Sequence, residues 1–182
     1  MLRTFPRPSW IFLLSAMFVL LLAQFQFTNW MEVHNDSLQA LNEATDGVLK
    51  GTPHWRAYQN RVLSPAIVYV LGWFTWHPMT LFVQGAIILL DAALFVLVLR
   101  RTGSHLLALL VLMACTLLWV LEQHYWSYTW DFAEAAGWLA LSWLALEGGT
   151  LRRILIVVAI SAFNRESAMF MALFPIITGM WM

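Results

Sequence analysis

The sequence predicts an all-α membrane protein, and its composition and its pattern of apolar runs both support that class. Of 182 residues, 61% are hydrophobic and 11% are charged, whereas ordinary soluble domains carry about 25% charged residues. Eleven tryptophans, many near the ends of apolar runs, are typical of membrane interfaces. We therefore expect a polytopic bundle of about six to seven membrane helices, with the lipid bilayer as its surroundings.

Charge and motif content argue against several other classes. The formal net charge is zero, so no basic field favours a nucleic-acid partner. The single cysteine, Cys115, lies in an apolar run and has no second cysteine for an internal disulfide. The chain has no glycine-rich nucleotide loop, no Cys/His zinc spacing and no GxSxG motif, which disfavours soluble nucleotide-dependent enzymes and the common hydrolases.

We interpret residues 1–182 as a single membrane domain. An apolar run from Trp10 to Gln24 follows Arg3 and Arg7, which is typical of a retained anchor helix with a cytoplasmic N-terminus. The long polar segment after it is interpreted as an outer loop, and the remaining apolar runs form a helical bundle. The three parts are residues 1–27, 28–61 and 62–182.

Within the outer loop, apolar side chains recur at helical spacing, which predicts an amphipathic helix at the membrane surface. These residues are Leu38, Leu41, Ala44, Val48 and Leu49. Asp36 or Asn35 precedes them as a candidate N-cap, with Gln39 completing a capping box after Asp36. Gly51 is the expected stop, because glycine adopts the left-handed conformation that ends many helices.

Prolines divide the apolar runs that follow. Ser64-Pro65 begins a helix that ends near Trp76, and its roughly 13 residues are marginal for a membrane span. Runs from Pro78 to Leu99 and over 106–121 are long enough to cross. The first of these two runs contains Asp91, a buried ionisable candidate.

A polar, aromatic loop at 122–131 separates the next two runs. Asp131 and Glu134 are read as a second capping box at the start of a helix that ends at Leu146. His124 lies among aromatic residues of this loop, and this setting suits an interfacial histidine as well as a functional one.

The last polar feature is Asn164-Arg165-Glu166, which lies between two short apolar runs. The run before it covers about 15 Å as helix, against a hydrocarbon core of about 30 Å. Ionisable residues at that depth are costly and are functional candidates by default. Asn164 at a helix start, beside Arg165, would form an anion site. The alternative is an ion pair of Arg165 with a carboxylate that only holds helices together.

Two topologies remain open. If Arg3, Arg7, Arg100–Arg101 and Arg152–Arg153 are all cytoplasmic, the polar loops and Asn164 gather on the outer face. That arrangement requires the short helix before Pro78 not to span the membrane. If it does span, the later loops are inverted. We favour the first arrangement, because it brings most polar groups to one face.

The outer loop and its junction with the bundle offer further candidates. His34 and Asp36, two residues apart, could bind a divalent metal ion, although a solvated amphipathic face with a helix cap explains most of this cluster. Arg61, where the chain returns to the membrane, could hold a phosphate or contact lipid headgroups.

The order of four pieces carries a family resemblance. Asp36 with Gly47 and Gly51 comes first, followed by Tyr58-Gln-Asn-Arg61-Val-Leu-Ser-Pro65. Trp130-Asp131-Phe132 and Asn164-Arg-Glu-Ser167 come later. This order resembles the N-terminal module of bacterial integral membrane glycosyltransferases of the GT-C superfamily. The paired acidic motif that is common in that superfamily is missing near Asp36. The chain is also shorter than a typical full enzyme of the superfamily. Both departures fit a truncated, split or non-catalytic version.

The resemblance implies a multi-pass protein of the bacterial inner membrane that uses a polyprenyl-phosphate sugar as its donor. Asp36 would be the catalytic acid that activates the acceptor or binds a metal ion, with Glu32 or Asp46 as substitutes. The other implied residues would contact the substrate, with the two arginines at its phosphate. They are Arg61, His124, Asp131, Asn164, Arg165 and Glu166.

Two other functions fit the same residues. A small structural or assembly subunit of a membrane complex would use its buried polar groups as contacts between helices and would have a membrane protein partner. A small transporter would use Asp91 and the broken helices.

Overall fold

The computed structural model describes residues 9–51, 61–126, 129–164 and 170–173. In these residues the regular structure is entirely helical, which confirms the predicted all-α class. The helices are α1 (Ser9–His34), η1 (Asn35–Ser37), α2 (Leu38–Leu49), α3 (Leu63–Leu71), α4 (Pro78–Thr102), α5 (His105–Trp126), α6 (Thr129–Glu147) and α7 (Leu151–Ala162). The predicted residues Arg165 and Glu166 lie outside the described residues.

Three stretches of the described chain are long and apolar enough to cross a bilayer. They are Trp10–Leu49, which contains α1, together with Pro78–Thr102 and His105–Glu122. Large apolar side chains remain exposed along all three, such as Leu21 at 60%, Leu89 at 72% and Leu118 at 63%. Side chains of this kind are compatible with lipid and costly in water, so the structure agrees with a membrane protein.

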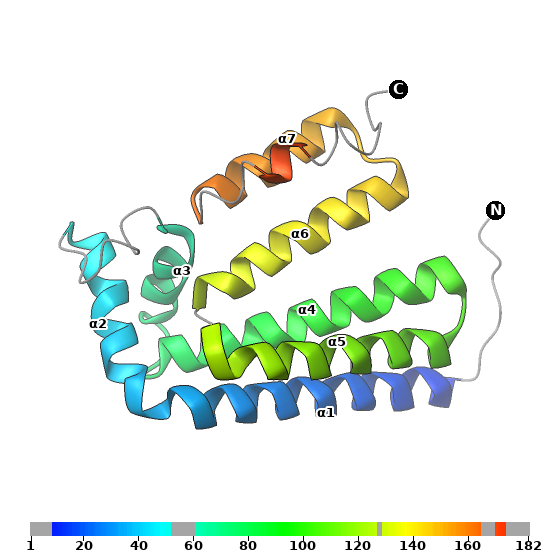
Figure 1. Ribbon diagram of the computed structural model, residues 1–182, viewed down its shortest axis with the longest axis horizontal. Helices are drawn as coiled ribbons and strands as arrows, with labels where there is room; N and C mark the ends of the chain where they lie inside the picture. The colour runs from blue at the N-terminus through cyan, green and yellow to red at the C-terminus, as the bar shows by residue number, and fades with distance from the viewer. Residues whose placement is uncertain (1–8, 52–60, 127–128, 165–169, 174–182) are drawn as a thin grey trace.

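The helices form two parts that meet along α4 (Figure 1). The long helices α1, α4 and α5 pack side by side, while α6 packs against α4 and α7 packs against α6. The short helices α2 and α3 lie together at the end where α1 finishes. The main core is at this end, where Trp30 and Val83 are fully buried and Phe132 nearly so.

Helix α1 continues ten residues beyond the predicted end of its apolar run, to His34. The polar residues that suggested an ending find partners inside the fold. The Nε2 atom of Gln26 donates to Asp91 and to Thr116, and Gln24 bonds to Thr28. These bonds satisfy Gln24 and Gln26 while the backbone bonds of the helix continue, whereas the buried Oδ1 atom of Asn29 has no hydrogen-bond partner among the described residues.

The predicted helix of the outer loop is present as α2, but its predicted start is wrong. Asp36 lies within η1, and the N-cap is Ser37, which forms no side-chain capping bond. Gln39 donates to Glu43 and not to the cap. The reason is the tight turn after α1: the Ser37 backbone is near φ −103° and ψ −1°, whereas a capping residue adopts the extended region.

The other end of α2 agrees with the sequence. The helix ends at Leu49, and Gly51 has a φ of 68°, which favours glycine. One face of α2 is buried, through Leu41, Ala44, Thr45 and Gly47.

The loop predicted at 122–131 is shorter than expected. Helix α5 continues to Trp126 and α6 begins at Thr129. His124 is therefore a helical residue, and its side chain lies outside the described part of the structure. Asp131 lies in the first turn of α6 and is not its N-cap, so the predicted capping box is wrong. An acidic side chain there still complements the helix dipole.

Helix α3 is shorter than the predicted helix, because it ends at Leu71 and not near Trp76. Its nine residues cover about 14 Å, less than half of the hydrocarbon core. The chain turns back before α4, and α4 and α6 both end at the opposite end of the molecule (Figure 1). There Arg100 lies 3.9 Å from Glu147 and over the Trp143 ring.

This arrangement agrees with the topology favoured from the sequence. Arg100–Arg101 and Arg152–Arg153 lie at one end of the bundle, where α4 ends and α7 begins. The turn η1, the helices α2 and α3, and Asn164 lie at the other end. Which end faces the cytoplasm stays a prediction.

Candidate functional site

Two segments far apart in the sequence meet where α3 begins and α7 ends. The backbone N–H groups of Val62 and Leu63 donate to the carbonyl oxygen of Phe163, at 2.9 and 3.1 Å. Ser64 Oγ donates to Asn164 Oδ1 at 3.3 Å, and both side chains are buried, at 0% and 1% exposure. We call this contact of residues 61–64 with 163–164 the α3–α7 junction. It satisfies backbone donors that a helix start leaves without intrahelical partners.

The junction brings together the segments that contain two residues predicted for phosphate binding. Arg61, half-buried, directly precedes the bonded residues Val62 and Leu63. Asn164, almost fully buried, lies across from Ser64. The sequence suggested their chemistry, and the junction is the contact that places them at the same end of the bundle.

Replacing Ser64 by alanine is expected to lower the free energy of unfolding by about 1 kcal/mol, because it removes one buried neutral hydrogen bond. The measurement is reversible unfolding in mixed micelles. Ser37→Ala is the control, since Ser37 is exposed and bonds only to a carbonyl three residues back. Equal effects for the two variants would show that the Ser64–Asn164 bond contributes nothing.

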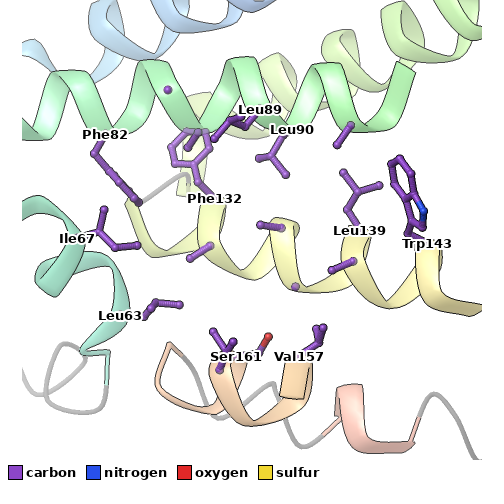
Figure 2. A pocket seen from close by; sticks show the side chains of 18 of the residues that line it. Leu63, Ile67, Phe82, Leu89, Leu90, Phe132, Leu139, Trp143, Val157 and Ser161 are labelled. Atoms are coloured by element: carbon purple, nitrogen blue, oxygen red, sulfur yellow. The ribbon is translucent and has the colours of Figure 1, made fainter. Parts of the chain in front are cut away.

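A large apolar groove lies beside the junction (Figure 2). Its volume is about 1140 Å³, slightly above the usual range for ligand pockets, roughly 300–1,000 Å³. Side chains from four helices line it, including Leu63 and Ile67 of α3, Phe82, Leu89 and Leu90 of α4, Phe132, Leu139 and Trp143 of α6, and Val157 and Ser161 of α7. Almost all of the lining is hydrocarbon or aromatic.

The groove is elongated along the helices. Its lining extends from Phe132 to Leu144 on α6, a distance of about 18 Å at the helical rise. That is more than half the thickness of the hydrocarbon core. Leu63, two residues after Arg61, lies at one end, and Arg153 lines the other. The groove is thus long and apolar, and Arg153 is the charged residue among those that line it.

The predicted residues of the outer loop lie elsewhere. His34 is stacked on the Trp30 ring, with centroids 4.6 Å apart, and its Nδ1 lies 3.0 Å from the Trp30 carbonyl oxygen. Asp36 is exposed in η1. The possible substitutes Glu32 and Asp46 are exposed too, and Asp46 pairs with Lys50 at 3.4 Å. Within the described residues no three His, Cys, Asp or Glu side chains group as metal ligands. Metal binding at His34 and Asp36 stays a prediction.

Asp131, the second residue of the Trp-Asp-Phe motif, is half-buried. The next residue, Phe132, is 1% exposed. Its ring lies 6.4 Å from that of Trp30 and 5.7 Å from that of Trp119. The Trp-Asp-Phe motif therefore contains a packing residue that joins α6 to α1 and α5, and this role was not expected from the sequence.

Sequence reasoning also missed the partners of Asp91. Gln26 Nε2 lies 3.0 and 3.1 Å from the two carboxylate oxygens of Asp91, and 2.9 Å from Thr116 Oγ1. All three side chains are buried, each on a different long helix. A signal did exist, since Gln26 and Thr116 are polar residues beside apolar runs. Nothing in their spacing indicated that they meet.

Together, the helices, their exposed apolar surfaces and the groove define a helical membrane protein with an apolar groove beside a polar junction. Comparison with protein-family models, with curated proteins and with solved structures found no match.

Proposed function

We propose that this protein binds a lipid-linked phosphate sugar, with the lipid chain in the groove and the phosphate at the α3–α7 junction. In this arrangement α3, α6 and α7 join the three long helices in the bilayer, and α2 lies at its outer surface. The resemblance to GT-C glycosyltransferases suggests a polyprenyl-phosphate sugar as the ligand and the bacterial inner membrane as the location.

The observation that carries the proposal is the groove itself. Its lining is apolar over about 18 Å and comes from α3, α4, α6 and α7. An unoccupied apolar cavity loses dispersion contacts, and water gains little in a space with few polar partners. A long hydrocarbon chain matches both its shape and its chemistry.

The residues at the α3–α7 junction support the placement of the ligand's phosphate there. An arginine guanidinium provides donors in a planar fork that matches phosphate oxygens. Arg61 lies two residues from the groove residue Leu63, and Asn164 lies three residues from the groove residue Ser161. A phosphate there would leave its lipid chain directed along the groove.

Catalysis, where it occurs, would use Asp36. An exposed carboxylate can accept the proton of an acceptor hydroxyl as that oxygen attacks the sugar carbon and the lipid phosphate departs. In this proposal Asp36 is needed for transfer but not for binding, and His124 and Asp131 contact the sugar.

The test is the binding of a radiolabelled polyprenyl-phosphate sugar to the protein in lipid nanodiscs. Gly85→Leu should lower the affinity at least tenfold, since Gly85 lines the groove and a Cβ built there meets nothing within 4 Å. The Cβ of the new side chain therefore has open space, and the rest of the leucine would extend into the groove. Arg61→Ala should also weaken binding, and Asp36→Asn should leave it unchanged.

The matched control is Ala114→Leu, which adds similar volume at an exposed position of α5 outside the groove. Saturable binding that Ala114→Leu preserves and Gly85→Leu removes supports the proposal. If the folded wild-type protein does not bind the labelled lipid, or if Gly85→Leu binds like wild type, the proposal is wrong.

A partner helix is the second candidate occupant, favoured by the small residues of the lining. Gly85, Ala86, Ala136 and Ala140 all line the groove, and small residues let transmembrane helices approach closely. The protein would then be a subunit of a membrane complex. In that case Gly85→Leu would reduce the mass of the assembly extracted in mild detergent and would not affect lipid-linked sugar.

A further inference from the structure

A second polar site lies behind some of the side chains that line the groove. Asp91, Gln26 and Thr116 meet where α1, α4 and α5 pack together. Asp91 is 6% exposed, Gln26 is 5% and Thr116 is 1%. Asp91 lies near the middle of α4, about 20 Å from its first residue and about 17 Å from its last along the helix axis. This cluster is therefore at the depth where a bilayer is most apolar.

The cluster borders a cavity of about 160 Å³. Asp91, Gln26 and Thr116 line one part of it, and Trp119 also lines it. The buried Nε1 atom of Trp119 has no hydrogen-bond acceptor among the described residues. A cavity of this size holds several waters, and polar partners are what make such waters stable. The space is suited to a small hydrated ligand.

The charge of Asp91 has no counter-charge in the described part of the chain. Its carboxylate oxygens accept hydrogen bonds from Gln26, and it takes part in no ion pair with the described residues. Acidic side chains within membrane helices normally pair with a cation or belong to an ion or proton path. An amide donor lowers the cost of a buried carboxylate but does not neutralise it.

We propose that this cavity is a binding site for a small monovalent cation, with Na⁺ as the ligand. Asp91 provides one negative charge, which a single positive charge balances. The carboxylate oxygens of Asp91, the hydroxyl oxygen of Thr116 and, after rotation of its amide, the carbonyl oxygen of Gln26 are hard ligands of the kind that such ions prefer. Water in the cavity would complete the coordination and accept the Trp119 N–H.

A divalent ion fits this site less well. One carboxylate would leave a net positive charge in an apolar environment, and no group of three His, Cys, Asp or Glu side chains occurs in the described residues. The cavity shares Leu90, Phe132 and Leu139 with the apolar groove. The cation site is therefore a neighbour of the groove, separated from it by these side chains, and its existence does not depend on what the groove binds.

The test is equilibrium binding of ²²Na⁺ to the purified full-length protein in nanodiscs. The wild-type protein should bind one Na⁺ saturably. Asp91→Asn should weaken binding at least tenfold, because it removes the only charge of the site. Thr116→Val, which keeps the shape of the side chain and removes its oxygen, should weaken it several-fold.

Glu43→Gln is the control, since Glu43 is an exposed acid on α2 that lies far from the cavity lining. It should bind Na⁺ like wild type. If Asp91→Asn does not fold, Thr116→Val provides the decision, because it leaves the carboxylate in place.

Three results would overturn the proposal. The folded wild-type protein could show no saturable ²²Na⁺ binding, or both cavity variants could bind as wild type does. In the third, thermal stability would change with pH and remain the same when NaCl replaces choline chloride. That result would assign the site to a proton.

Discussion

Replacing Gln26 by leucine should lower the free energy of unfolding by about 1.5–3 kcal/mol, the range for a hydrogen bond to a charged group. Gln26 Nε2 is the donor to both carboxylate oxygens of Asp91 and to Thr116. Leucine has similar size but no donor, so the Asp91 carboxylate would stay buried without that bond. Reversible unfolding in mixed micelles measures the change.

The same helix provides the control for this experiment. Gln24→Leu makes an identical chemical change two residues earlier, at an exposed side chain with only long hydrogen bonds, at 3.3 and 3.5 Å. Its effect should stay within about 0.5 kcal/mol. In an Asp91→Leu background, Gln26→Leu should cost much less than in the wild type, since coupled residues are not additive. Equal effects of the two glutamine variants would contradict the role of the cluster.

Substituting alanine for Gly137 should destabilise the protein by about 1–3 kcal/mol, the usual cost of overpacking. A Cβ at Gly137 would lie 2.5 Å from Ser161 Oγ and 3.1 Å from the end of Met171. Helices α6 and α7 would have to separate, because the serine side chain is short and sits on the neighbouring backbone. Unfolding experiments in the same micelles measure the loss.

Gly85 and Ser161 provide the controls for this second prediction. Gly85→Ala adds the same methyl group in open space and should stabilise the protein by roughly 0.5–1 kcal/mol through helix propensity. Adding Ser161→Ala to Gly137→Ala removes the atom nearest the new methyl group and should restore part of the loss. If the two glycine substitutions have effects of the same sign, the α6–α7 contact is looser than the structure indicates.

The sequence was sufficient for those elements whose signals are local. The apolar runs after Pro78 and before Glu122 are long enough to define α4 and α5 by themselves. Gly51 ended α2 as predicted, since the left-handed conformation depends on one residue. A short helix before Pro78 was also predicted, although α3 is shorter than expected, because it ends at Leu71 and not near Trp76.

Other features depended on distant contacts and could not be predicted. The apolar run of α1 was predicted to end at Gln24, because the partners that satisfy Gln26 inside the fold, Asp91 and Thr116, are 65 and 90 residues away. Asp36 looked like an N-cap because the tight turn after α1 leaves no mark in the residue types. The groove was not visible because each lining residue, taken alone, is an ordinary lipid-facing or core residue of its own helix.

The candidate phosphate site could be predicted only in part. Arg61 and Asn164 were chosen for their chemistry, and the α3–α7 junction brings their segments together. Asp36 was chosen by family resemblance, and the structure leaves it on an exposed turn. Chemistry can be read from residue types, whereas the proximity of two groups requires the fold.

The α3–α7 junction also has a consequence for biosynthesis. Ser64 and Asn164 are 100 residues apart, so at about 5–20 residues per second a ribosome takes roughly 5–20 s to make the second segment after the first. During that interval the first amides of α3 have no acceptor from Phe163 and must be hydrated or held by the insertion machinery. The early helices therefore reach the bilayer before the α3–α7 junction has formed, and formation of the junction is a late step in maturation.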